Sequence, residues 1–180
     1  MQTLPDIIAK DLTVVFCGIN PGLGSAAAGH HFANRSNRFW RVIHLAGFTP
    51  EQIRAENDRT LLTYGCGLTT AVERPTVRAD ELSRHEFLAA SAALGQKIER
   101  YAPRHIAFLG KAAYSTISGQ RKVEWGPQPA AFAGAKAWVL PNPSGLNRAF
   151  KLDDLVQAYR QLYLEAGYMV DDIPPSTARI

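Results

Sequence analysis

Short runs of almost continuously apolar residues constrain the fold of this chain more than any other feature. Residues 13–18 read TVVFCG, are rich in β-branched and apolar types, and end at a turn rich in glycine and proline. Residues 105–110 and 136–141 have the same character, and residues 66–69 form a shorter candidate strand. Such runs, with few polar residues, are typical of parallel strands that are covered on both faces. The sequence therefore predicts a mainly parallel sheet.

Amphipathic helical patterns lie between and after these runs. One is predicted to begin at Ser36, a favourable N-cap residue, and to stop at Gly47. Another begins at a capping box formed by Ser83 and Glu86, and a last one is closed by Gly167. Their apolar positions are Phe39, Trp40 and Ile43, then Phe87, Leu94, Ile98 and Tyr101, and finally Leu152, Leu155, Val156, Tyr159 and Leu162. Strands that alternate with helices predict an α/β fold, a three-layer α/β/α sandwich with a mainly parallel central sheet.

The composition limits the classes of protein to consider. A length of 180 residues suits a single domain, which we expect at residues 1–170, followed by a loosely ordered tail at residues 171–180. No apolar run approaches the roughly 18 residues that span a bilayer, and residues 1–10 lack the pattern of a secretory signal. We therefore expect a cytoplasmic protein with no membrane partner. The net charge of +4 permits nucleic acid binding but does not require it.

Few residues suit a metal or a cofactor. Cys17 and Cys66 lie in apolar stretches, which indicates buried, reduced thiols, and two cysteines cannot supply the ligands of an iron–sulfur cluster. Residues 22–27, GLGSAA, fit the dinucleotide fingerprint G-x-G-x-x-[GA], but that fingerprint needs its first glycine at the strand end and an acidic residue roughly 20 positions on. No acidic residue lies between Gly22 and Glu51. We predict no metal and no cofactor, and a nucleotide-binding α/β enzyme stays open as an alternative.

Two irregular loops follow the first and the last of the predicted strands. Residues 18–25 read GINPGLGS and residues 142–148 read NPSGLNR, and each loop places an asparagine before a proline, which ends the strand sharply. In open parallel sheets, ligands bind beyond the carboxyl ends of the strands. If the two strands lie close together, both loops border one cleft, and this cleft is the candidate site.

These loops belong to a longer set of motifs that resembles a known family. The motifs are VVFCGINPGLGSA (14–26), GHHFANRSNRFW (29–40), AGF (46–48), ERPTVRADELSR (73–84), LGKAAY (109–114) and WVLPNPSGLNR (138–148). Over most of residues 12–166 the chain resembles the mismatch-specific uracil and thymine DNA glycosylases, the second family of the uracil-DNA glycosylase superfamily. The resemblance implies a uracil-DNA glycosylase-like fold and a monomeric, monofunctional enzyme of base excision repair, associated with the nucleoid if the source is bacterial. Such an enzyme flips and excises uracil, ethenocytosine and, as an open question, thymine mispaired with guanine in double-stranded DNA.

The resemblance assigns roles around the first loop. Asn20 matches the catalytic residue that positions the water attacking C1′, Phe32 matches the ring that stacks on the flipped base, and Ser25 lies beside C5 of the pyrimidine. An amide cannot act as a general base near neutral pH, so we predict a slow enzyme that relies on positioning and on stabilising the departing base as an anion. The remaining residues of the base pocket are Gly18, Ile19, Gly22 and Asn142. Backbone N–H groups of the turn, those of Ile19 and Gly22 in particular, are candidate donors to the departing base.

The second loop resembles the element that opens the duplex. Leu146 matches an apolar side chain that fills the space left by the flipped base, whose unstacking costs on the order of a few kcal/mol. Gly145 and Asn147 lie where backbone groups read the orphaned guanine, and Arg148 borders the gap and the phosphates. The predicted DNA-contacting residues are Ser144, Gly145, Leu146, Asn147, Arg148 and Lys111.

Some positions leave the function open. Bacterial relatives often carry lysine where this chain has Thr70, and serine is more usual where it has Asn147, so the preferred base is not fixed. A protein that recognises mispairs with little or no turnover is therefore an alternative. Arg35, Arg38 and Arg41 form either a solvated basic helix face or a set of phosphate contacts.

Overall fold

The computed structural model describes residues 3–168, and the tail expected at residues 171–180 lies outside them. Within the described residues, five strands form one sheet in the order β2-β1-β3-β5-β4. The strands are β1 (Val14–Gly18), β2 (Cys66–Thr70), β3 (His105–Leu109), β4 (Gly126–Pro127) and β5 (Lys136–Leu140). All neighbours pair in parallel except the short β4, which is an antiparallel edge. The predicted mainly parallel sheet is confirmed, and its longer strands lie within a residue of their predicted bounds.

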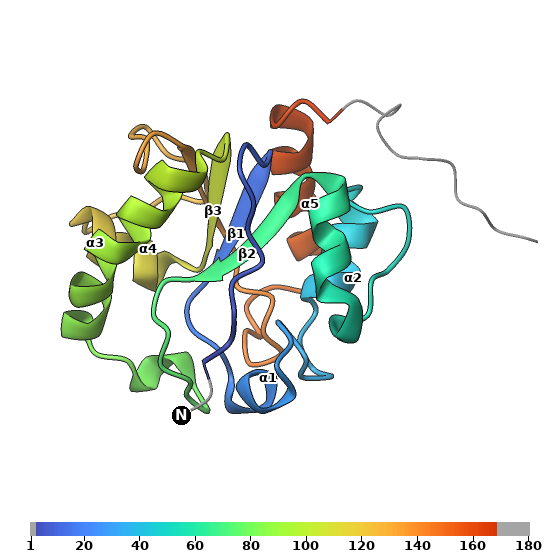
Figure 1. Ribbon diagram of the computed structural model, residues 1–180, viewed down its shortest axis with the longest axis horizontal. Coiled ribbons are helices and arrows are strands. Elements are labelled where there is room, and N and C mark those ends of the chain that lie inside the picture. The colour runs from blue at the N-terminus through green and yellow to red at the C-terminus, as the bar shows by residue number, and fades with distance from the viewer. Residues whose placement is uncertain (1–2, 169–180) are drawn as a thin grey trace, which may run out of the picture.

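Helices cover both faces of the sheet, which confirms the three-layer prediction (Figure 1). They are α1 (Leu23–Ala28), α2 (Phe39–Ala46), α3 (Arg84–Tyr101), α4 (Lys111–Ser118) and α5 (Leu152–Glu165), with the 3₁₀ segments η1 (Ala55–Tyr64) and η2 (Ala79–Glu81). Helices α2 and α5 pack on one face, and α3 and α4 pack on the other (Figure 1). Among residues 3–168, no helix is both long and apolar enough to cross a membrane.

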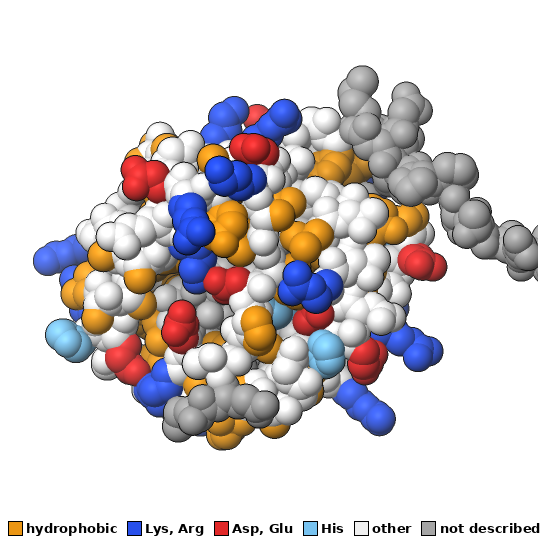
Figure 2. Space-filling model, in the orientation of Figure 1, with side chains coloured by type: hydrophobic (Ala, Val, Ile, Leu, Met, Phe, Trp, Pro, Cys, Tyr) orange, Lys and Arg blue, Asp and Glu red, His pale blue; other side chains and the backbone are white. Residues whose placement is uncertain are grey.

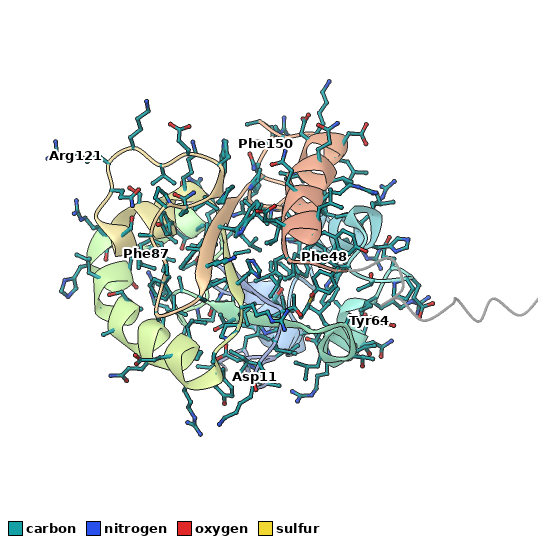
Figure 3. The ribbon with its side chains drawn as sticks, turned by 90° about the horizontal axis from the view of Figure 1, so that it is seen from above. Asp11, Phe48, Tyr64, Phe87, Arg121 and Phe150 are labelled. Carbon is teal, nitrogen blue, oxygen red and sulfur yellow. The ribbon has the colours of Figure 1, made fainter. Side chains whose placement is uncertain are left out.

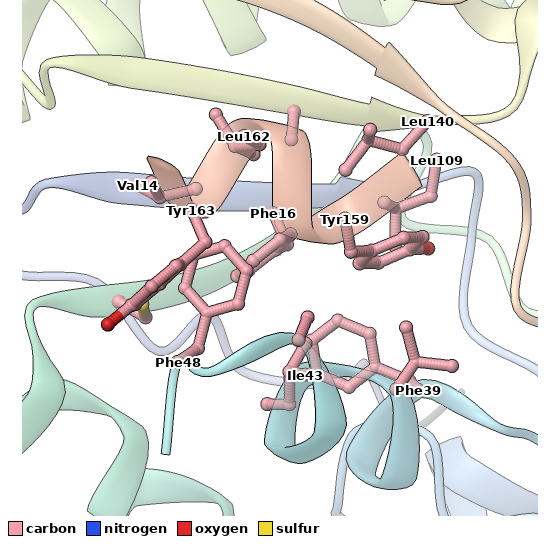
Figure 4. Close-up of a cluster of buried hydrophobic side chains, with 14 of the residues drawn as sticks. Val14, Phe16, Phe39, Ile43, Phe48, Leu109, Leu140, Tyr159, Leu162 and Tyr163 are labelled. Atoms are coloured by element: carbon pink, nitrogen blue, oxygen red, sulfur yellow. The ribbon is translucent and has the colours of Figure 1, made fainter. Parts of the chain in front are cut away.

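Alternation of side chains along each strand divides the core into two halves. Phe16 of β1 faces α2 and α5, where its ring meets those of Phe39 and Phe48 edge-on with centroids 5.3 Å apart (Figure 4). The preceding residue, Val15, faces α3 and α4. Figure 3 shows Phe48 and Phe87 on opposite sides of the sheet. Because both faces are buried, the strands need apolar residues at every position, which is the pattern that the sequence shows.

The two cysteines are buried, as expected. Burial raises the pKa of the Cys17 thiol and of the Cys66 thiol to about 12, so both thiols are protonated and unreactive at neutral pH. In the part of the chain that the structure describes, no group of three or more His, Cys, Asp or Glu side chains is placed to hold a metal ion.

The two predicted helix caps turn out differently. At α3 the capping box is confirmed: the Glu86 N–H donates to Ser83 Oγ at 3.2 Å, and the Ser83 N–H donates to Glu86 Oε2 at 2.8 Å. The prediction that Ser36 caps α2 is wrong. Helix α2 begins at Phe39, whose N–H donates to Asn37 Oδ1 at 2.9 Å. Asn37 is the nearer residue able to form such a turn, and the Ser36 hydroxyl is engaged within the preceding turn instead.

The sheet order brings the two candidate loops together. Strands β1 and β5 lie on either side of β3, so the loops that follow them share the carboxyl edge of the sheet. Gly110, directly after β3, lies between these loops with a φ of +120°. A Cβ at Gly110 would lie 3.4 Å from Ile19 and 3.9 Å from Asn142. The condition on which the predicted cleft depended is therefore met.

Candidate active site

A cleft of about 820 Å³ opens at the carboxyl edge of the sheet. Most of its lining comes from the β1 loop (residues 19–22), the segment 31–37, the strap (residues 71–81) and the β5 loop (residues 141–151). The residues predicted for catalysis and for the base pocket that line it are Gly18, Ile19, Asn20, Gly22, Ser25, Phe32 and Asn142. Of the predicted DNA-contacting residues, the lining contains Ser144, Leu146 and Asn147, whereas Gly145, Arg148 and Lys111 lie outside it.

Two acceptors fix the side-chain amide of Asn20. Its Nδ2 donates to the main-chain oxygen of Arg74 and to Oγ1 of Thr76, both at 2.8 Å. The Arg74 carbonyl can only accept, and the Thr76 hydroxyl donates its own proton to the Arg78 carbonyl at 2.7 Å. The end of the amide that faces these groups must therefore be the NH₂, and both of its protons are engaged. The amide oxygen Oδ1 accepts no hydrogen bond from residues 3–168, so it is available to a water or a ligand.

The strap that supplies these acceptors is tied to its surroundings. The Thr76 N–H donates to the Pro21 carbonyl at 3.1 Å, and the Leu23 N–H donates to the Thr76 carbonyl at 3.2 Å. Glu86, in the first turn of α3, accepts from Arg74 Nε at 2.6 Å, and this pairing lowers the pKa of the Glu86 carboxyl to about 2. The partners of the amide are thus held by both the β1 loop and α3.

The ring of Phe32 forms one wall of the cleft. Its φ of +52° is a left-handed conformation that costs on the order of 1–3 kcal/mol in a residue other than glycine, so surrounding contacts must hold it. One face of the ring stacks on Phe39, with centroids 4.2 Å apart and planes at 23°. Gly18 lies beside it, and a Cβ at Gly18 would contact Phe32 Cζ at 3.7 Å. An aromatic wall next to a glycine suits a planar ligand.

Two buried polar side chains of the lining are engaged by main-chain groups. Ser25 Oγ accepts from the Ala33 N–H at 3.0 Å. The His31 ring donates from Nε2 to the Pro5 carbonyl at 2.7 Å, because a carbonyl can only accept. Burial lowers the pKa of His31, so its imidazole is neutral at neutral pH. A neutral ring whose proton is bound to a carbonyl is poorly suited to act as a general acid.

Hydrogen bonds within the β5 loop fix its shape. The Ser144 N–H donates to Asn142 Oδ1 at 3.0 Å, and Asn147 Nδ2 donates to the Asn142 main-chain oxygen at 2.9 Å. The Leu146 N–H donates to Ser144 Oγ at 3.2 Å. Although it is apolar, Leu146 is 71% exposed, and it lines the cleft. An ordered loop therefore presents an apolar side chain to solvent beside the cleft.

Comparison with known proteins decides the family. The uracil DNA glycosylase superfamily matches residues 5–164, which is most of the chain. This chain belongs to the uracil DNA glycosylase superfamily. Membership of this superfamily supports a hydrolase that acts as a DNA glycosylase, with DNA as its partner.

A solved structure of similar fold is the solution NMR structure of a "putative Uracil DNA glycosylase" from Methanosarcina acetivorans. The two chains share 20% sequence identity with a TM-score of 0.61, and the match covers 90% of this chain and 98% of that one. At this level of identity the similarity shows the fold alone.

Among the described residues, one carboxylate lines the cleft, that of Asp80, and the sequence-based predictions do not include it. Asp80, on η2, is 63% exposed at its side chain and is paired with the Arg78 guanidinium. The hydrogen bond from Arg78 lowers the pKa of the Asp80 carboxyl. A carboxylate that is exposed, paired and of lowered pKa is a weak base, so Asp80 is poorly suited to activate a water.

Lys111 lies beside the β5 loop rather than in the cleft. Its Nζ lies 4.5 Å from the centre of the Trp125 ring, and the Trp125 ring meets Phe150 edge-on at 5.3 Å. Trp125 is 41% exposed and has no role in the sequence-based predictions. The contact with Phe150 places this pair of side chains at the end of the β5 loop.

The sequence left two roles open for Arg38, a solvated position on a basic helix face or a phosphate contact, and the structure shows neither. Its guanidinium donates to main-chain oxygens of the β5 loop instead of pointing to solvent or to a phosphate. No sequence signal indicates this role, because every residue carries a carbonyl and the partners need no particular side chain.

Proposed function

We propose that this protein is a monofunctional, mismatch-specific DNA glycosylase that flips uracil out of a G·U pair and hydrolyses its glycosidic bond. The observation that carries the proposal is the Asn20 amide, whose NH₂ is fixed by two acceptors and whose Oδ1 is left for a water. A water bound at Oδ1 attacks C1′ of the deoxyribose. The C1′–N1 bond breaks, its electrons leave with the base, and a proton of the water passes to solvent or to the departing base.

Alignment supplies most of the rate in this mechanism. An amide accepts no proton at neutral pH, so Asn20 contributes by orienting the water and not by activating it as a base. Negative charge develops on the departing uracil, and fixed donors stabilise it. The N–H groups of Ile19 and Gly22, both in the cleft lining, are the candidate donors. This chemistry predicts slow turnover.

The cleft suits a flipped pyrimidine. Its volume falls within the range of about 300–1,000 Å³ that is common for ligand pockets. One face of Phe32 stacks on Phe39, which leaves the other for the base, and stacking contributes about 1–3 kcal/mol per base. Ser25 lies beside C5, where its size controls entry of the thymine methyl, and Thr70 adds no positive charge to the lining. The proposed substrates are uracil, ethenocytosine and thymine opposite guanine.

The β5 loop is proposed to enter the duplex. Leu146 fills the space of the flipped base. The Asn147 N–H already donates to the Ser144 carbonyl at 3.0 Å, and the Asn147 carbonyl accepts from Arg38 at 3.0 Å. Recognition of the orphaned guanine therefore rests more on the main chain of Gly145 than the sequence indicated. Basic side chains outside the cleft, Arg148 and Lys111, contact phosphates in this proposal.

A panel of duplexes tests the proposal. Enzyme in excess is incubated with labelled duplexes that carry G·U, G·T or guanine opposite ethenocytosine, with a G·C duplex as control, and alkali converts abasic sites to strand breaks. Band shifts on the same duplexes measure binding. We expect single-turnover cleavage of the G·U strand and none of the G·C duplex. Mismatch binding without cleavage of any substrate would instead identify a non-catalytic mismatch-binding protein.

A further inference from the structure

The side chain of Arg38, at the start of α2, binds the β5 loop. Arg38 immediately precedes α2, and its partners lie 105 to 112 residues further along the chain. Nε donates to the Pro143 carbonyl at 3.2 Å, and Nη1 donates to the Phe150 carbonyl at 2.7 Å. Nη2 donates to the carbonyls of Ser144 and Asn147 at 2.8 and 3.0 Å. One planar group thus holds the beginning, the middle and the end of the loop.

This guanidinium is held by carbonyls alone. Within residues 3–168 Arg38 forms no ion pair, and its hydrogen-bond acceptors are all main-chain oxygens. Four of the five N–H groups of the side chain are engaged, so little donor capacity is left for a phosphate. A lysine could not reproduce the arrangement, because its ammonium is a single point and cannot reach acceptors spread around a planar fork.

The same segment of chain carries the base platform. Phe39 follows Arg38 directly, and its ring stacks on Phe32 at 4.2 Å. On the other side, Gly145 lies so close to the segment before α2 that a Cβ there would be 2.7 Å from the Ser36 carbonyl oxygen. The apolar tip of the β5 loop and the aromatic wall are therefore attached to one another through residues 36–39.

We propose that Arg38 is a positioning residue that sets Leu146 at a fixed place relative to the Phe32 ring. This inference rests on the proposed glycosylase function and specifies how the site couples two events. Insertion of Leu146 into the duplex and capture of the base on Phe32 must occur in one encounter, and an aligned loop avoids the cost of ordering itself during that encounter. Arg38 acts on base flipping and leaves the chemistry at Asn20 unchanged.

The test compares two substrates with the same G·U pair. In one the pair lies in a regular duplex, and in the other it is flanked by mismatches, so that the uracil is already unstacked. For Arg38→Met and Arg38→Lys we expect single-turnover cleavage of the regular duplex to fall about 100-fold, the loss that a misplacement of about an ångström can cause when the mutation lies far from the chemistry. Cleavage of the pre-opened substrate should stay within about threefold of the wild type. Arg100→Met, which removes an exposed arginine near the opposite edge of the sheet, is the matched control and should leave both rates unchanged.

A second variant keeps the test independent of Arg38 itself. Gly145→Ala forces the loop away from Ser36 without removing a donor, and it should lower cleavage of the regular duplex more than cleavage of the opened one. Equal losses on both substrates for Arg38→Met, Arg38→Lys and Gly145→Ala would overturn the inference, because a general structural defect lowers cleavage of the two substrates alike. Retained activity in Arg38→Lys on the regular duplex would also overturn it, since charge alone would then suffice.

Hydrogen exchange gives a readout that does not depend on cleavage. We expect the amides of residues 142–150 to exchange about tenfold faster in Arg38→Met than in wild type, with β3 and β5 unchanged. Unchanged exchange in the loop contradicts the positioning role even if activity falls. A wild-type protein that cleaves neither substrate would refute the proposed function instead, while the exchange experiment would still decide whether Arg38 orders the loop.

Discussion

At Asn20, the neighbouring groups determine which atom of the side-chain amide stays available to a water or a ligand. The neighbouring groups are a carbonyl and a hydroxyl whose proton is already bound, so the NH₂ donates to two acceptors, whereas Oδ1 accepts no hydrogen bond from residues 3–168. The orientation follows from the types of the partners, and it selects a group that can accept from water but cannot take its proton. A carboxylate at this position would have no protons to donate to these two acceptors.

Substitution Asn20→Asp places an oxygen 2.8 Å from the Arg74 carbonyl, where Nδ2 now donates. Two acceptors repel, so the pKa of the introduced carboxyl is raised, and the carboxylate forms only above that raised value. Once ionised, it can act as a general base and stabilise positive charge at the sugar. We expect uracil release to rise with pH through one ionisation and to exceed the wild-type rate by about 100-fold at the plateau, the lower end for general base catalysis. Single-turnover rates across the pH range decide the point, and an Asp variant slower than wild type at every pH contradicts it.

At the scale of elements, the site includes two loops that directly follow the strands β1 and β5. The sequence predicted this because apolar runs mark buried strands and Asn-Pro pairs mark where β1 and β5 end. It did not predict α1, whose glycine, serine and alanine residues carry no apolar period. It placed the α2 cap at Ser36, and this prediction is wrong because turns formed by nearby asparagine side chains compete with the serine. The role of Arg38 could not be predicted, because its partners are main-chain carbonyls that only the tertiary fold brings near it.

The contact between Lys111 and Trp125 leads to a prediction about how DNA affinity depends on salt. If Lys111 binds a phosphate next to the β5 loop, Lys111→Met should make the slope of log affinity against log salt less negative by about 0.9. Trp125→Leu should also make the slope less negative without removing a charge, because the indole positions the ammonium. Lys136→Met, at the amino end of β5, is the control and should keep the wild-type slope. Binding is measured on a duplex with a stable abasic analogue opposite guanine, and equal effects of both lysine variants would exclude a specific contact.

At the scale of the whole molecule, the net charge of +4 is small for 180 residues. Basic and acidic side chains are interspersed on the face shown in Figure 2, so a net charge of +4 does not gather into one continuous basic patch there. A small net charge gives only a weak overall field, so we expect binding to DNA to depend on a few placed groups. Two histidines, His31 and His105, are instead buried in the fold, and burial lowers the pKa of each.

These histidines predict how stability depends on pH. In the unfolded chain each imidazole titrates near its ordinary pKa of about 6.5, whereas in the folded protein the pKa is lower. The unfolded state therefore binds protons first, and the free energy of unfolding should decrease as the pH falls below about 6.5. Urea unfolding at several pH values measures this decrease. His31→Gln, which keeps a donor but cannot titrate, should make the decline shallower, and the exposed His85→Gln should leave it as in wild type; a decline that persists fully in His31→Gln would rule out this residue as its source.

The central claim, that the oriented Asn20 amide performs the reaction, is tested most directly by Asn20→Ala on a G·U duplex. Single-turnover cleavage and band shifts are measured together, with the exposed Asn57→Ala as a control for loss of an amide elsewhere. We predict that Asn20→Ala loses cleavage by at least about 100-fold, since the water is no longer held, while its affinity for the G·U duplex stays close to wild type. Undiminished cleavage by Asn20→Ala would contradict it.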